Sequence, residues 1–273
     1  MTAAYPPERH LLRDLRLAFE HGDDGTSRAR FPVVPEVCGA SGSVGIGAVA
    51  VLVDVIGGGL AALAARPDWI ATADLTLHLT RAVRDGHVEA RASVLRAGRT
   101  TVVIEVGLRD AREQEVGVAT MSFSVLPRRD SNLDVGGMRA SGWTTMADAR
   151  SRLHAPLLDE LGLTVVDPHA GVVEVPMLDW SRNSMGAMQG GAVGAVAAAA
   201  AEVACNARAG GALVATDLQL TYLAFGKVGP IRTRADVTAC DDGRAVAQVE
   251  LVDAGGESRR TAVARVVATR PLP

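Results

Sequence analysis

Two short segments of the chain combine residue types that can do chemistry. Asp54 lies between Val53 and Val55 inside a long apolar stretch, and burying a charge that nothing compensates is expensive. Its carboxylate is therefore a functional group, half of an ion pair, or a group at a water-facing edge. The Gln-Gly-Gly segment at 189–191 precedes a second apolar stretch. It is either the first turn of a helix, whose backbone N–H groups attract negative charge, or an ordinary glycine turn.

The apolar stretches beside these segments predict the elements that position them. Residues 45–66 and 190–211 are rich in Ala, Val and Gly and are apolar on nearly every side. That pattern is typical of a helix buried on most of its surface. Glycines, Asp54 and Glu202 interrupt the two stretches, so neither is an unbroken run of about 20 apolar residues, and we expect no membrane span.

The chain repeats itself at an offset of 143 residues. The matched positions are Asp74-Leu75 with Asp217-Leu218, Val94 with Val237, and Asp110 with Asp253. Each copy is an alternating apolar and polar strand, a glycine turn and two further alternating strands, which is typical of antiparallel, half-buried strands. We therefore predict an α+β protein in which each half is one helix wrapped by an antiparallel sheet of about five strands.

The repeat also sets the expected domain organisation. Residues 127–147 are polar and rich in glycine, which predicts a linker between an N-terminal lobe at 1–126 and a C-terminal lobe at 148–273. A lone sheet would leave an exposed edge. We therefore expect the two sheets to join edge to edge, with both helices on the concave side.

Composition limits the functional classes that remain. The chain has 273 residues and a formal net charge of −3, which gives no basic footprint for nucleic acid. Cys38, Cys205 and Cys240 form no disulfide framework and fit a reducing compartment, and charges interrupt any N-terminal signal sequence. We therefore predict a cytoplasmic protein. No histidine pair or cysteine pair has metal-ligand spacing.

The segment Asn183-Ser-Met-Gly-Ala-Met-Gln189-Gly190-Gly191 resembles the N-x-x-G-x-x-H-G-G motif of hotdog acyl-CoA thioesterases of the phenylacetate-degradation type. Gln189 stands where that family usually has histidine. In the family an acidic residue follows nine positions later, where this copy has Ala198. The first copy keeps the acid as Asp54 but has Gly45 nine positions before it. The resemblance implies a tandem (double) hotdog fold.

In that family the site lies between two subunits, so the resemblance implies one composite site between the lobes. Asp54 would act as nucleophile or as general base on water, two roles that the sequence does not separate. The N–H of Gly190 would hold the negative charge on the thioester oxygen, and Gly191 would let the substrate approach the backbone. Asn183 would position the water or the carboxylate. Gln189 would fix the loop or donate to the thioester carbonyl.

Three further residues are weaker candidates. Glu202 lies one helical turn after Ala198, so it is either a replacement acid or a solvated helix end. Arg81 and Arg99 flank the first strand block, where they would meet the phosphates of coenzyme A or simply lie in solvent. The reciprocal site, with Ala198 facing residues 45–47, is expected to be inactive.

The resemblance implies an acyl-CoA thioesterase, with coenzyme A entering as part of the substrate and with no separate cofactor or metal. A non-catalytic acyl-CoA-binding protein is one alternative, because both copies of the motif are degenerate. An enoyl-CoA hydratase or dehydratase is another, although the Asp-x-Asn-Pro-x-His phrase of the hydratase-2 type does not occur. Family analogy also implies that whole chains pair into a homodimer. No nucleic-acid or membrane partner is expected.

Overall fold

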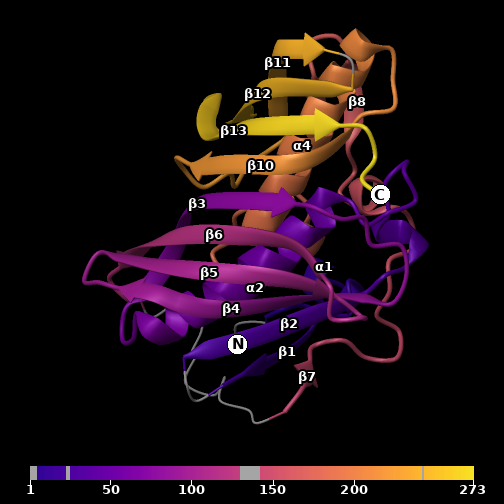
Figure 1. The fold of residues 1–273 in the computed structure, drawn as a ribbon. Coiled ribbons are helices and arrows are strands. Elements are labelled where there is room, and N and C mark those ends of the chain that lie inside the picture. Colours follow the sequence, from indigo (N-terminus) through magenta and orange to yellow (C-terminus); the bar gives the residue numbers. More distant parts are fainter. Residues whose placement is uncertain (1–4, 23–24, 130–141, 242) are drawn as a thin grey trace.

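All the strands belong to a single antiparallel sheet. The computed structural model describes residues 5–22, 25–129, 142–241 and 243–273. Its 13 strands follow the order β7-β1-β2-β4-β5-β6-β3-β10-β13-β12-β11-β9-β8, so strands of the N-terminal lobe occupy one half of the sheet and strands of the C-terminal lobe the other (Figure 1). Each half of the sheet has six strands, where the repeat predicts about five. The short strand β7 is an additional strand beside β1, at the edge of the N-terminal half.

The strands of the N-terminal half are β1 (Ala18–His21), β2 (Thr26–Pro32), β3 (Trp69–Leu79), β4 (His87–Ala97), β5 (Thr101–Asp110) and β6 (Glu115–Leu126), with β7 (Thr144–Thr145) at its edge. Those of the C-terminal half are β8 (Thr164–Asp167), β9 (Val172–Val175), β10 (Val214–Tyr222), β11 (Ile231–Asp241), β12 (Arg244–Asp253) and β13 (Arg259–Thr269). The helices are α1 (Leu11–Asp14), α2 (Ile46–Ala64), α3 (Leu157–Glu160) and α4 (Gly190–Ala209), with 3-10 turns at Pro35–Val37 and Asp179–Ser181.

The two halves of the sheet meet at β3 and β10, which pair antiparallel. Equivalent strand residues of the repeat face each other across this seam. Asp217 Oδ1 lies 2.5 Å from His78 Nδ1, and the Thr221 hydroxyl donates to Asp74 Oδ1 at 2.7 Å. Because Thr221 takes the place of His78 in the repeat, the two contacts are related by approximate two-fold symmetry. The continuous sheet confirms the expected edge-to-edge joining.

Helices α2 and α4 lie together on one face of the sheet (Figure 1). Both are long and apolar enough to cross a membrane by length and composition, but 67% of each apolar window is buried inside the protein, so they serve as core helices. Their buried side chains join those of both halves of the sheet in one hydrophobic cluster. Aromatic residues make up only 3% of the chain, so Ala, Val and Leu fill most of this core.

Glycines let α2 and α4 approach each other at backbone distance. A Cβ added to Gly191 would lie 2.3 Å from the Cα of Val51, and one added to Gly47 would lie 2.7 Å from the Cβ of Ala195. Gly47 and Gly191 hold equivalent places in the two helices, two residues after the N-cap. The close contact is thus used twice, once from each lobe.

The N-terminal segment ties the lobes together away from the seam. The Trp180 indole N–H donates to Asp14 Oδ2 at 2.8 Å, and an imidazole nitrogen of His10, Nε2, lies 2.8 Å from the carbonyl oxygen of Arg182.

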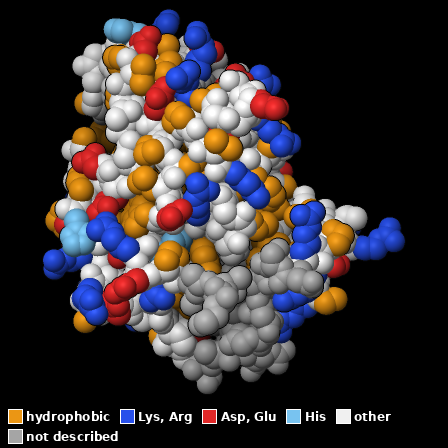
Figure 2. All heavy atoms as spheres, turned by 180° about the vertical axis from the view of Figure 1, so that it is seen from behind, with side chains coloured by type: hydrophobic (Ala, Val, Ile, Leu, Met, Phe, Trp, Pro, Cys, Tyr) orange, Lys and Arg blue, Asp and Glu red, His pale blue; other side chains and the backbone are white. Residues whose placement is uncertain are grey.

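Of the predicted linker at 127–147, residues 130–141 lie outside the described residues, and β7 at its end pairs with β1. Seen from behind, acidic, basic and apolar side chains are interspersed on the surface (Figure 2).

The helix contact gives a stability prediction. Gly191→Ala should lower the free energy of unfolding by about 1–3 kcal/mol, because the added methyl group would overlap the backbone of α2. Urea denaturation measures the change. Gly58→Ala is the matched control within α2, since the nearest atom to an added Cβ there is Phe123 Cε1 at 3.8 Å. An equal loss in both variants would contradict the contact.

Candidate active site

Asp54 is held at the boundary between the lobes by donors from both of them. It lies in the middle of α2 and is 9% exposed. Its Oδ1 accepts from the Thr72 hydroxyl of β3 at 3.0 Å, and its Oδ2 accepts from the Gln189 amide at 2.6 Å. Burial raises the pKa of Asp54 to about 6, while hydrogen bonds from Thr72 and from the backbone N–H of Gly191 act in the opposite direction.

Gln189 caps helix α4 and also binds Asp54, and the capping bond determines which end of its amide faces Asp54. It is the N-cap of α4, where its Oε1 accepts from the N–H of Ala192 at 2.9 Å. An amide side chain has one acceptor end and one donor end, so capping leaves the NH₂ group to bond Asp54. Of its two predicted roles, fixing the loop is the one that this geometry supplies.

The first peptide of α4 is held from both sides. The carbonyl of Gly190 accepts from the Tyr222 hydroxyl at 2.8 Å, while the N–H of Gly191, on the other side of the same peptide, donates to Asp54. A Cβ on Gly190 would lie 2.7 Å from Asp54 Oδ1, so only glycine permits this approach. Burial, followed by the charge of Asp54, raises the pKa of Tyr222 well above its ordinary value.

One N–H group of this turn remains for a ligand. The first N–H groups of a helix have no intrahelical acceptor. In α4 the N–H of Gly191 is taken by Asp54 and that of Ala192 by Gln189. Among the described residues, the N–H of Gly190 has no acceptor. It lies at the positive end of the α4 dipole, beside the Asp54 carboxylate.

These groups line a cavity of about 1040 Å³ between the lobes. The α2 side of the cavity is apolar and is lined by Val55, Gly58, Gly59, Ala62, Trp69, Ile70, Ala71 and Leu126. The C-terminal lobe contributes Met185, Met188, Leu223, Phe225, Val228 and Ile231, and the segments outside the lobes' sheets add Tyr5, Leu12 and Met146. Such a space, with few polar groups at one point, is typical of a small-molecule site.

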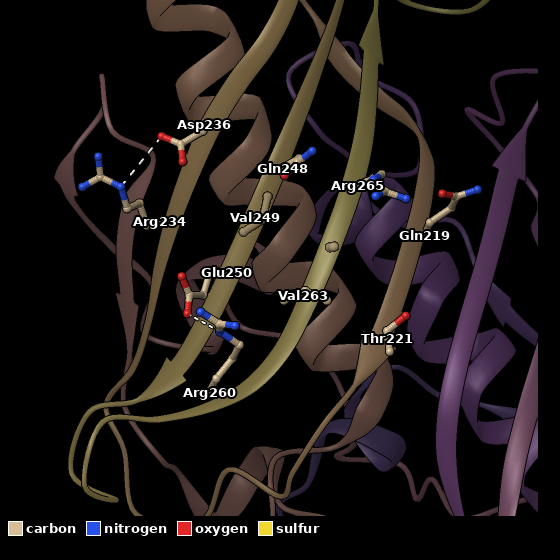
Figure 3. Close-up of a pocket in the computed structure, with 11 residues that line it drawn as sticks. Gln219, Thr221, Arg234, Asp236, Gln248, Val249, Glu250, Arg260, Val263 and Arg265 are labelled. Atoms are coloured by element: carbon tan, nitrogen blue, oxygen red, sulfur yellow. Dashed lines mark hydrogen bonds and ion pairs between the residues drawn. The ribbon is translucent and has the colours of Figure 1, made fainter.

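A second, smaller depression of about 470 Å³ lies on the outer face of β10 to β13. Figure 3 shows its side chains projecting from the strands, with α4 behind the sheet. Its acids are paired with arginines of the same face, Asp236 with Arg234 at 3.8 Å and Glu250 with Arg260. The sheet separates this depression from Asp54, so the composite cavity is the better candidate site.

Asn183 lines the cavity but serves the loop. Its Oδ1 accepts from the N–H groups of Met185 at 2.9 Å and Ala187 at 3.1 Å, which closes the turn before Gln189. No hydrogen bond joins it to Asp54 within the described residues. The structure therefore places Asn183 as a turn residue beside the site, with its amide NH₂ as its remaining polar group.

The weaker candidates lie outside the cavity lining. Glu202 is buried on α4, and its Oε1 accepts from the N–H of Ala215 at 2.7 Å. Burial raises its pKa, and that hydrogen bond acts in the opposite direction, so this side chain satisfies the start of β10 rather than replacing the missing acid. Arg81 and Arg99 are exposed, and neither lines the cavity.

Sequence reasoning missed two residues that touch the site. Thr72 precedes the repeated Asp74-Leu75 phrase, and Tyr222 closes the matching strand of the second copy. The β-bulge between Thr72 and Asp74 interrupts the alternation that would have assigned the face of Thr72. Among the described residues, no cluster of three His, Cys, Asp or Glu side chains could hold a metal ion.

The hydrogen bond from Thr72 has a measurable consequence. Thr72→Val should raise the pKa of Asp54 further above about 6, because it removes a donor that favours the ionised form. Carbon-13 NMR titration of aspartate-labelled protein measures this, with Asp54→Asn identifying the signal. Thr76→Val, on the same strand but facing away from α2, is the control. A pKa that stays unchanged in Thr72→Val would contradict the geometry.

Comparison with known proteins gives a family match for part of the N-terminal lobe. Residues 42–116, which contain both Asp54 and Thr72, match the family model of the thioesterase superfamily. The phenylacetate-degradation type expected from the 183–191 motif remains a prediction.

Solved structures match nearly the full chain. A putative thioesterase II from Thermobifida fusca is 16% identical, with a TM-score of 0.61 over 96% of this chain and 98% of that one. A putative thioesterase from Novosphingobium aromaticivorans is 18% identical, with a TM-score of 0.60 over 93% and 98%. An acyl-ACP thioesterase from Bacteroides thetaiotaomicron is 11% identical, with a TM-score of 0.59 over 90% and 98%. The chain therefore has a tandem hotdog fold along its length, and its N-terminal lobe matches the thioesterase superfamily over residues 42–116.

Proposed function

We propose that the protein hydrolyses acyl-CoA thioesters at one composite site between its lobes. The observation that carries the proposal is the Asp54 carboxylate of one lobe, bonded at 2.6 Å by Gln189 of the other, beside the free N–H of Gly190. Thioester hydrolysis needs a base for water and a donor for the developing oxyanion. Asp54 and Gly190 supply these two groups in an apolar cavity.

Asp54 acts as general base on water. Thr72 and Gln189 donate to one oxygen each, and the N–H of Gly191 is a third donor. A carboxylate has about four lone-pair positions, so one remains for a water molecule. The pKa of Asp54, raised to about 6, favours uptake of a proton from water, so we assign it the general-base role rather than the nucleophile role.

Gly190 stabilises the negative charge of the transition state. As water attacks the acyl carbon, the carbonyl oxygen becomes an oxyanion and accepts from the N–H of Gly190, with the dipole of α4 adding to the attraction. Tyr222 keeps this peptide in place through the Gly190 carbonyl. Preorganised donors of this kind need no rearrangement during the reaction.

The products follow from proton balance. Asp54 takes one proton from the attacking water as the new C–O bond forms. The C–S bond then breaks, and the departing thiolate takes up the proton that Asp54 received, which restores the carboxylate. A pKa of about 6 for Asp54 suits both steps near neutral pH, because the group is ionised at rest and accepts a proton more readily than an ordinary aspartate.

Asp54→Asn should lower kcat for an acyl-CoA by about 10²–10⁴, the size of a lost general base. The fold should persist, because the raised pKa means that the ionised carboxylate destabilises the folded state relative to the neutral one. Asparagine is neutral and nearly the same shape. Thiol release across a panel of acyl-CoA lengths measures turnover, and thermal unfolding checks the fold. In the unmodified protein, kcat/KM should decrease at pH values below about 6, because Asp54 becomes protonated there.

Full turnover in a folded Asp54→Asn variant would exclude this mechanism. Binding of acyl-CoA without thiol release by the unmodified protein would favour the non-catalytic alternative. Hydration of crotonyl-CoA, measured alongside, tests the hydratase alternative.

The effects of replacing Asp54 and Gln189 on kcat should not be additive. Because Gln189 acts on the reaction through its hydrogen bond to Asp54, the kcat of the double variant Asp54→Asn/Gln189→Ala should match that of Asp54→Asn within a few-fold. Effects of residues that act together are not additive. Urea denaturation controls for the lost helix cap of Gln189→Ala, which costs about 1 kcal/mol. Glu202→Gln, outside the cavity, should keep nearly full turnover. Multiplicative losses from Asp54 and Gln189 would show two independent roles.

A further inference from the structure

Both tyrosines of the chain line the cavity between the lobes. They are Tyr5 and Tyr222, and their hydroxyl groups bond to different backbone carbonyls. The hydroxyl of Tyr222 donates to the carbonyl of Gly190 at 2.8 Å, and that of Tyr5 donates to the carbonyl of Arg182 at 3.4 Å. The Gly190 carbonyl belongs to a peptide that also bonds to Asp54, whereas Arg182 lies in the loop that precedes α4.

A single peptide group connects Tyr222 to Asp54. The Gly190 carbonyl and the Gly191 N–H are the two ends of one planar peptide unit, the first peptide of α4. The carbonyl accepts from Tyr222, and the N–H donates to the Asp54 carboxylate. A donor on the carbonyl oxygen draws electron density from the peptide, so the N–H at its other end becomes a stronger donor. The phenol, the peptide and the carboxylate therefore form a chain of two hydrogen bonds that strengthen each other.

Tyr222 is held by the strand that joins the two lobes. It is the last residue of β10, where it pairs with Ala262 of β13. The residue before it, Thr221, donates to Asp74 of β3 at 2.7 Å across the seam. Because β10 is paired on both sides, the sheet fixes the place from which the phenol reaches the start of α4.

The Tyr222 hydroxyl keeps its proton over the pH range in which Asp54 titrates. Burial, followed by the charges of Asp54 and Asp74, raises the pKa of Tyr222 well above its ordinary value, whereas the pKa of Asp54 is about 6. The bond to the carbonyl is therefore present whether Asp54 is neutral or ionised, and it matters most when the acceptor carries charge. Among the described residues, the other titratable side chains of the cavity lining are Tyr5, Lys227, Asp253, Glu257 and Arg259.

We propose that Tyr222 is a positioning residue that acts on Asp54 through the first peptide of α4. Its hydroxyl polarises this peptide and directs the Gly191 N–H towards the carboxylate, which favours the ionised acid. The bond chain is a property of the fold, whereas its effect on turnover rests on the proposed hydrolysis. In that reaction, the chain keeps Asp54 ionised, and so able to take a proton from water, at a lower pH than burial alone would allow.

Tyr222→Phe removes the hydroxyl and keeps the ring. Carbon-13 NMR titration should show the pKa of Asp54 raised by about half a pH unit, because the ionised form loses part of its stabilisation. The amide proton of Gly191 should move to a lower chemical shift, because its hydrogen bond weakens. Tyr5→Phe is the matched control, since it removes the other tyrosine hydroxyl of the cavity without touching the Gly190 carbonyl, and it should change neither signal. Thermal unfolding checks that both variants are folded.

A fluorinated tyrosine tests the opposite sign without removing the hydroxyl. Because the chain has two tyrosines, incorporation of 3-fluorotyrosine into the Tyr5→Phe variant labels Tyr222 alone. Fluorine draws electron density from the ring, so the phenol becomes a stronger donor and the pKa of Asp54 should fall. This protein keeps the bond to the Gly190 carbonyl, so it tests the bond chain even if Tyr222→Phe does not fold.

Three results would overturn the proposal. Unchanged Asp54 and Gly191 signals in folded Tyr222→Phe would leave Tyr222 as a packing residue. Equal changes in Tyr5→Phe would mean that the acid responds to the loss of any nearby hydroxyl. A fluorotyrosine that raises the pKa of Asp54, or leaves it unchanged, would show that the peptide does not transmit the effect.

The NMR measurements need no turnover, so they separate this inference from the proposed function. If the protein hydrolyses acyl-CoA, the low-pH limb of kcat/KM in Tyr222→Phe should move to higher pH by the same amount as the pKa of Asp54. A raised pKa in a protein that releases no thiol would support the bond chain and contradict the hydrolysis. A raised pKa with an unmoved limb would support the bond chain and contradict the role of Asp54 as base. Thiol release with an unmoved limb and unchanged NMR signals would contradict the bond chain alone.

Discussion

The close packing of α2 against α4 is the contact on which the site depends. Gly191 lies against the backbone of Val51, and one helical turn further along α2, Asp54 meets the first turn of α4. A side chain in place of either glycine of that turn would push the helix ends apart. The Asp54 carboxylate would then lose the N–H of Gly191 and the amide of Gln189 together. The same contact therefore determines both the packing of the helices and the geometry of the candidate site.

This contact also explains how a carboxylate can remain in an apolar helix. Burial raises the pKa of Asp54, and the hydrogen bonds to it limit that rise. Thr72 supplies one donor from the same lobe, whereas Gln189 and Gly191 supply theirs from the other. The N-terminal lobe alone would have a buried carboxylate with too few donors. The C-terminal lobe alone would have a capped helix with no acid beside it. The joined sheet and the paired helices keep the two half-sites in one position.

Much of this architecture could be predicted from the sequence, because repetition and alternation are properties of the chain itself. The offset between Asp74 and Asp217 predicts two equivalent units, and their shared edge becomes the β3–β10 seam. The resemblance of residues 183–191 to a hotdog thioesterase motif implies that Asp54 and Gln189 meet across the lobes, and the structure brings these side chains together. Thr72 could not be predicted, because a β-bulge sets which face it occupies. Tyr222 could not be predicted either, because its hydrogen bond to the Gly190 carbonyl depends on how the end of β10 packs against the start of α4.

The duplication explains why the two halves differ where they meet. At the place equivalent to Asp54, the second copy has Ala198, and at the place equivalent to Gly190 the first copy has Ile46, both nearly fully buried. Alanine and isoleucine pack as core residues there, so the reciprocal position has neither an acid nor a glycine equivalent to Gly190. A second buried carboxylate would cost stability unless a second set of donors compensated for it. One copy carries the acid and the other carries the capped glycine turn, so the proposed site takes its parts from both halves of the chain.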